Sequence, residues 1–160
     1  MEPALTPIVR RVPAGEVEIS IREWAGAERP FVLVHGLASN AQTWDGVAHG
    51  LASAGHHVVA FDQRGHGLSD KPDSSYGFEE VTSDLRAVVS SLGVQQPIVA
   101  GQSWGGNVVM HFAAHHPGVA AGSCWLTVAF PTSPAVQERR GRTYRSDCGR
   151  LTCWARLEPE

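Results

Sequence analysis

The pentapeptide GQSWG at residues 101–105 constrains the fold of this chain more than any other segment. An apolar run at residues 97–100 precedes it, and a helix-like stretch at residues 106–114 follows it. This pattern predicts a strand, a sharp turn and a helix. The backbone of a serine in such a turn is strained, so small residues, here Gly101 and Gly105, are needed two positions before and after it. We therefore expect the Ser103 hydroxyl to project at a helix N-terminus, whose dipole favours developing negative charge.

Strand and helix patterns alternate along most of the chain before residue 130. Apolar or alternating runs predict strands at residues 8–12, 16–24, 31–34, 57–61, 97–100 and 124–130. Apolar residues at helical spacing predict helices at residues 41–54, 78–92 and 104–116. Such alternation implies an α/β fold with a mainly parallel sheet and flanking helices. The pattern stops after about the sixth strand.

Two further segments accompany the pentapeptide. FVLVHGL at residues 31–37 is a buried-strand pattern that ends in His-Gly, and VVAFDQRGHGLSD at residues 58–70 is a strand that runs into a glycine-rich turn. In this order, the three segments resemble the α/β-hydrolase superfamily, and most closely its esterase-like serine hydrolases. The resemblance covers about residues 7–120. It implies the N-terminal part of the α/β-hydrolase fold.

The resemblance also implies roles for individual residues. Ser103 would be the nucleophile, acting on an ester or a related carbonyl substrate. The backbone N–H groups of Leu37 and Trp104 would stabilise the oxyanion that forms. His35 and Gly36 would shape the loop that carries the Leu37 donor.

The general base and the acid of such a site are missing from the pattern, because this superfamily places them after the serine on later strands. The histidines after Ser103 are His111, His115 and His116, on or at the end of the predicted helix 104–116. That helix runs away from Ser103, and His111 is already roughly 12 Å along its axis. The acids after Ser103 are Glu138, Asp147, Glu158 and Glu160. We therefore assign neither base nor acid, and we expect the chain as written to be inactive.

Residues 131–160 have neither a helical nor a strand period. We interpret residues 1–130 as a partial α/β-hydrolase domain and residues 131–160 as an irregular tail. The tail could be disordered, it could be a short binding segment, or it could be a frame-shifted translation. We favour the frameshift, because codons for residues 122–130 can be chosen that read VLLVDGGF in another frame, a pattern typical of the next strand in this superfamily. The hypothesis fails if the other frames of the gene give only stops or nonsense.

Composition excludes several classes of function. A formal charge of −3 and a pI near 6.2 give no basic surface for nucleic acid. No apolar run approaches a membrane-spanning length, and residues 1–13 lack the apolar stretch of a signal peptide. The 3 cysteines are odd in number, which argues against a disulfide framework, and they lack C-x-x-C spacing for zinc. We expect a soluble, cytoplasmic protein with a small ester-like substrate, no cofactor and no metal, and we leave its oligomeric state open.

Three alternatives stay open at this stage. The chain could be a non-catalytic α/β module that binds a ligand or a partner chain. Cofactor-free haloperoxidases and carbon–carbon bond hydrolases of the same superfamily also keep a serine nucleophile. Epoxide hydrolases and haloalkane dehalogenases are disfavoured, because they place an aspartate at that position.

The segment DQRGHG at residues 62–67 has the composition of a metal or acid–base cluster. Its glycines also suit a tight turn, in which Asp62 and Arg64 would satisfy backbone groups of the loop. We predict this structural role rather than a catalytic one.

Overall fold

The computed structural model describes residues 6–128, 144–148 and 151–155. Within them, an 8-stranded sheet has the strand order β1-β2-β4-β3-β5-β6-β8-β7. The strands are β1 (Ile8–Ala14), β2 (Val17–Trp24), β3 (Glu28–Val34), β4 (His56–Phe61), β5 (Ile98–Gln102), β6 (Gly122–Val128), β7 (Tyr144–Cys148) and β8 (Leu151–Ala155). The helices are η1 (Ala41–Trp44, a 3₁₀ helix), α1 (Asp45–Ser53), α2 (Phe78–Ser91) and α3 (Trp104–His115).

The α/β class predicted from the sequence is confirmed, with one refinement of the sheet. The central strands β4, β3, β5 and β6 pair in parallel. The pairs at both edges are antiparallel: β1 with β2, β2 with β4, β6 with β8 and β8 with β7. The sheet is therefore mixed, with its parallel part at the centre.

Most predicted elements lie within a few residues of the observed ones. The predicted helix 41–54 is divided, because the first turn is the 3₁₀ helix η1, in which the Asn40 side chain accepts a hydrogen bond from the Gln42 N–H. The last predicted strand, 124–130, begins earlier, at Gly122, and its residues 129–130 lie outside the described part. No strand period marks the residues of β7 and β8, which fall in the segment expected to be irregular. Residues 131–143, 149–150 and 156–160 also lie outside the described part.

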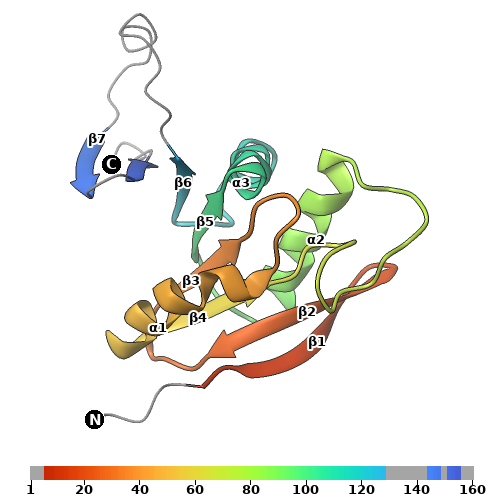
Figure 1. Cartoon of the computed structure of the whole chain (residues 1–160), viewed down its shortest axis with the longest axis horizontal. Helices are drawn as coiled ribbons and strands as arrows, with labels where there is room; N and C mark the ends of the chain where they lie inside the picture. The colour runs from red at the N-terminus through yellow and green to blue at the C-terminus, as the bar shows by residue number, and fades with distance from the viewer. Residues whose placement is uncertain (1–5, 129–143, 149–150, 156–160) are drawn as a thin grey trace, which may run out of the picture.

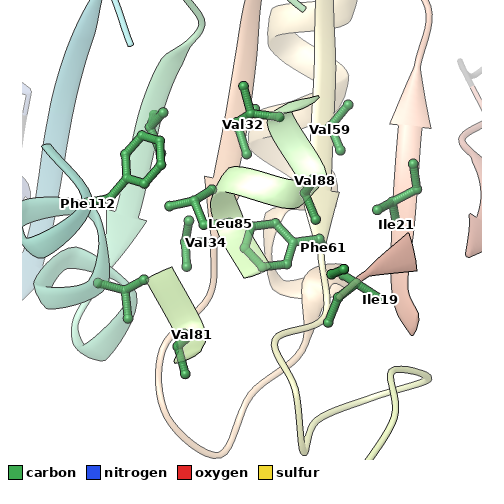
Figure 2. Packing of buried hydrophobic residues seen from close by; sticks show 14 of the residues in the cluster. Ile19, Ile21, Val32, Val34, Val59, Phe61, Val81, Leu85, Val88 and Phe112 are labelled. Carbon is green, nitrogen blue, oxygen red and sulfur yellow. The ribbon is translucent and has the colours of Figure 1, made fainter. Parts of the chain in front are cut away.

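The central strands lie between α1 on one side and α2 and α3 on the other (Figure 1), and apolar side chains cover both of their faces. On one face, alternate strand residues such as Val32 and Phe61 pack against α2 and α3, where Leu85 and Phe112 are fully buried (Figure 2). On the other face, the intervening strand residues, such as Leu33, pack with η1 and α1. This two-sided burial explains why β3 and β4 read as continuous apolar runs.

Two observations bear on the expectations from composition. No helix in the described part of the chain has the length and apolar character that a bilayer crossing requires. Cys124 on β6 is disulfide-bonded, which the odd cysteine count did not lead us to expect.

Candidate functional site

Ser103 stands at the junction of β5 and α3, as the N-cap of the helix. Its φ of 55° and ψ of −118° lie in a region that side chains rarely adopt. A Cβ atom at Gly101 would lie 2.2 Å from the Gly105 carbonyl oxygen, and one at Gly105 would lie 2.3 Å from the Val34 carbonyl oxygen. Both glycines are therefore required by close backbone packing around the turn.

The Ser103 side chain is exposed, and its hydroxyl makes no hydrogen bond within the described residues. Its backbone is anchored, because the Ser103 N–H donates to the Leu126 carbonyl of β6 at 3.0 Å. The Ser103 carbonyl accepts from the Gly106 N–H at 2.9 Å, in the first turn of α3. The turn thus presents an unengaged hydroxyl from a fixed backbone.

The two expected oxyanion donors lie on segments that the fold brings to this turn. Trp104 is the first residue of α3, where helix N–H groups lack intrahelical acceptors. Leu37 follows β3, which pairs in parallel with β5, so the loops after these strands meet at one edge of the sheet. A Cβ built on Gly36 would lie 3.4 Å from the Ser103 Cβ, which places the Gly36 backbone directly against the serine.

His35 is fully buried beneath this loop. Its Nδ1 lies 2.7 Å from the Gly36 carbonyl oxygen, and its Nε2 accepts a hydrogen bond from the Gln63 N–H at 3.0 Å. Burial lowers the pKa of His35, although the hydrogen bond to Gly36 opposes this shift. His35 is therefore a neutral ring bonded to the loop backbone.

The segment 62–67 forms the turn that its glycines predicted. Asp62 Oδ1 accepts from the Ala41 N–H at 2.7 Å, and its Oδ2 accepts from the Leu68 N–H at 2.8 Å. Arg64 instead donates two hydrogen bonds to Asp84 of α2, at 2.6 and 2.7 Å, and one to the Ser75 carbonyl at 2.6 Å. Asp62 satisfies backbone N–H groups as predicted, and Arg64 also ties the loop to α2.

The histidines after Ser103 are engaged elsewhere. His111 Nδ1 lies 3.1 Å from the Thr82 hydroxyl, and the His115 ring stacks on the His111 ring at 4.0 Å. His116 packs beside Arg86 and Phe112. Of the four acids after Ser103, Glu138, Glu158 and Glu160 lie outside the described residues, and the structure describes only the backbone of Asp147. Among the described side chains, none of these histidines is hydrogen-bonded to Ser103.

Gln63, for which the sequence predicts no role, has its side chain buried against His35. Its position inside the glycine-rich segment was visible, but the contact joins residues 28 positions apart. Within the described residues, no group of three or more His, Cys, Asp or Glu could hold a metal ion.

Comparison with known proteins gives consistent matches. Residues 29–150 match the sequence model of the family described as "alpha/beta hydrolase fold". Over 123 residues the chain is 39% identical to Epoxide hydrolase B of Mycobacterium tuberculosis (strain ATCC 25618 / H37Rv), covering 71% of this chain and 34% of that protein. Epoxide hydrolase A of the same strain is 32% identical over 146 residues, covering 89% of this chain and 45% of that protein.

A solved structure is similar as well. The crystal structure of Epoxide Hydrolase A from Mycobacterium thermoresistibile matches with a TM-score of 0.68 and 33% identity, over 72% of this chain and 37% of that one. The chain thus spans about a third of the length of the first of these relatives and less than half of the other two.

Proposed function

Because the chain belongs to the alpha/beta hydrolase fold family, we propose that it carries the nucleophile and oxyanion part of a serine hydrolase site for ester substrates. The supporting observation is the exposed, unengaged Ser103 hydroxyl held at a backbone φ of 55°. In this reaction the Ser103 oxygen bonds to the ester carbonyl carbon, and the serine proton passes through solvent to the oxygen of the departing alcohol. The N–H groups of Leu37 and Trp104 stabilise the resulting oxyanion, and the alcohol then leaves.

The choice of an ester over an epoxide rests on the identity of the nucleophile. The relatives named above are epoxide hydrolases. A carboxylate that opens an epoxide leaves an ester on the enzyme, which water cleaves. A serine hydroxyl would leave an ether, which water does not cleave. Attack on a carbonyl leaves an acyl-serine instead, and water releases it as a carboxylic acid.

A second candidate is a non-catalytic module that binds a ligand or a partner. It is favoured by one observation, that no base is hydrogen-bonded to Ser103 within the described residues. In that case the N–H groups of Leu37 and Trp104 would bind a ligand, and Ser103 would not be acylated.

Covalent labelling distinguishes these functions. The chain would be incubated with 4-nitrophenyl acetate and with a fluorophosphonate, and adducts would be located by peptide mass spectrometry. We expect an adduct on the Ser103 peptide that is lost in Ser103→Ala and retained in Ser90→Ala, a control at an exposed helical serine. Labelling of other sites alone would contradict the proposal and favour the binding module. Turnover of styrene oxide would favour the epoxide chemistry of the relatives.

A further inference from the structure

His35 and Gln63 form a buried pair beneath the loop that carries Leu37. Their exposed fractions are 0% and 1%. Gln63 holds His35 at two points: its backbone N–H donates to His35 Nε2 at 3.0 Å, and its side-chain Nε2 donates to the His35 carbonyl at 2.7 Å. The other amide atom, Gln63 Oε1, is buried and has no hydrogen-bond partner within the described residues.

These contacts determine where the imidazole proton lies. Because Nε2 accepts from the Gln63 N–H, it carries no proton, and the proton of the neutral ring is on Nδ1. Nδ1–H then donates to the Gly36 carbonyl at 2.7 Å. The 3.4 Å approach of Gln63 Nε2 to Nδ1 therefore joins two donors and is not a hydrogen bond.

The orientation of one peptide follows from this bond. The Gly36 carbonyl and the Leu37 N–H belong to the same trans peptide and point in opposite directions. His35 holds the carbonyl on the buried side of the loop. The Leu37 N–H consequently points away from His35, while the Gly36 backbone lies against Ser103 and Gln102.

We infer that Gln63 is a positioning residue, which holds His35 so that the Gly36–Leu37 peptide presents its N–H to the oxyanion. This role rests on the function proposed above. Its printed hydrogen bonds are with His35, and within the described residues none joins it to Ser103, so it acts through His35. An apolar side chain of equal length would fill the same space without a buried unpaired oxygen, so the benefit of glutamine here lies in the Nε2 donor.

The hydrogen bonds that join Gln63, His35 and Gly36 should respond to pH. A proton added to His35 Nε2 would face the Gln63 N–H, and the hydrogen bond between them would be lost. Two titratable groups face the His35 ring. His66, whose ring centroid lies 5.0 Å from that of His35, lowers the pKa of His35, and Asp62 raises it. Lowering the pH through the His35 titration should therefore slow acylation of Ser103.

The test uses the full chain with ¹⁵N-labelled histidine and backbone. Gln63→Met keeps the side-chain length and removes both amide atoms, and Gln42→Met is the matched control at an exposed glutamine. We expect the wild-type His35 ring to show protonated Nδ1 and unprotonated Nε2 at pH 8. In Gln63→Met, the Leu37 amide resonance should shift and the acylation rate of Ser103 should fall about tenfold, since outright loss of an oxyanion donor costs about 100-fold.

The outcomes separate positioning from a merely structural role. Gln63→Met should leave the urea midpoint nearly unchanged, whereas a structural role would lower it and leave the acylation rate per folded molecule intact. A proton on Nε2 in the wild type would overturn the inference even if the variant does not fold. An unshifted Leu37 resonance in a folded variant would do the same. If wild-type Ser103 is not acylated at all, the proposed function fails, and the resonances alone still decide whether Gln63 orients the peptide.

Discussion

Ser103 holds a backbone conformation that destabilises the folded chain. A φ of 55° in a residue other than glycine costs about 1–3 kcal/mol. Ser103→Gly removes this strain, although glycine also gains freedom in the unfolded chain. We expect Ser103→Gly to raise the free energy of unfolding by about 1 kcal/mol relative to Ser103→Ala, which keeps the strain.

Urea unfolding of the two variants measures this difference. Neither variant should be labelled at position 103, so any gain in stability is separated from the chemistry. A Ser103→Gly chain less stable than Ser103→Ala would show that the turn is not strained. The expected result would mean that the chain loses folding stability in order to hold the Ser103 hydroxyl in an exposed position.

His35 should make folding dependent on pH. Burial lowers its pKa in the folded chain below the ordinary value of 6.5, so the unfolded chain binds a proton at a higher pH than the folded chain does. The stability that depends on the neutral ring is complete above pH 6.5. It is lost as the pH falls from there toward the folded pKa, by at most about 1.4 kcal/mol per pH unit.

Ring resonances followed from pH 8 to pH 5 provide the measurement. The His35 signals should stay in the neutral form below pH 6.5, while the free energy of unfolding declines. The pKa of His116 is also lowered, by slight burial and by Arg86, so separate resonances are needed to distinguish the two rings. A His35 ring that titrates at or above 6.5 would contradict the expectation.

At the residue scale, the sequence predicted the two glycines that flank Ser103 and did not predict a role for Gln63. The expectation of glycine at positions 101 and 105 came from the pentapeptide itself, and in the structure a Cβ atom at these positions would lie 2.2 and 2.3 Å from backbone carbonyl oxygens. The position of Gln63 against His35 depends on β3 and β4 pairing first. No local pattern marks such a contact, so its importance is visible only in three dimensions.

At the scale of elements, the ion pair between Arg64 and Asp84 connects α2 to the loop after β4. The two side chains are 9% and 2% exposed and form a two-point contact. Removing one partner leaves a buried charge, which typically costs about 3–5 kcal/mol. We expect Asp84→Asn and Arg64→Met each to destabilise the chain by this amount.

A double-mutant cycle is the measurement. Arg64→Met combined with Asp84→Leu should cost much less than the sum of Arg64→Met and Asp84→Leu, because no unpaired charge remains. Additive losses would show that the two residues contribute independently. Arg22→Met is the control, because Arg22 pairs with Asp45, a carboxylate whose side chain is 43% exposed.

Element prediction was reliable where periodicity was strong. Helix α2 was predicted at residues 78–92 and observed at Phe78–Ser91, since its buried stripe is regular. The 3₁₀ turn Ala41–Trp44 was missed because its hydrogen bonds, rather than its apolar pattern, distinguish it from α1. Strands β7 and β8 were missed because residues 144–155 carry no period, and their pairing with β6 is a tertiary contact.

For the whole molecule, three segments at the edge of the sheet where Ser103 lies expose an apolar side chain each. Leu37 and Leu68, in the loops after β3 and β4, are 68% and 69% exposed, and Phe78 at the start of α2 is 37% exposed. Apolar patches on soluble chains commonly mediate association. We predict that the chain self-associates through these three exposed side chains, and that the double variant Leu37→Gln with Leu68→Gln associates less.

Sedimentation velocity at tens of micromolar protein would measure this. Val47→Gln is the matched control, because Val47 is 50% exposed on α1 and belongs to neither of these loops. If Val47→Gln reduces association equally, exposed apolar side chains in general would be responsible, rather than Leu37 and Leu68 in particular. A wild-type chain that is monomeric at this concentration would contradict the prediction.

The strand order has a consequence for synthesis on the ribosome. β3 lies between β4 and β5, and Phe31 of β3 pairs with Ile98, 67 residues later in the chain. At about 5–20 residues per second, the partner emerges about 3–13 s after β3. During that interval one long side of an apolar strand has no neighbour, so the nascent chain offers a binding site to chaperones until the Ser103 segment is made.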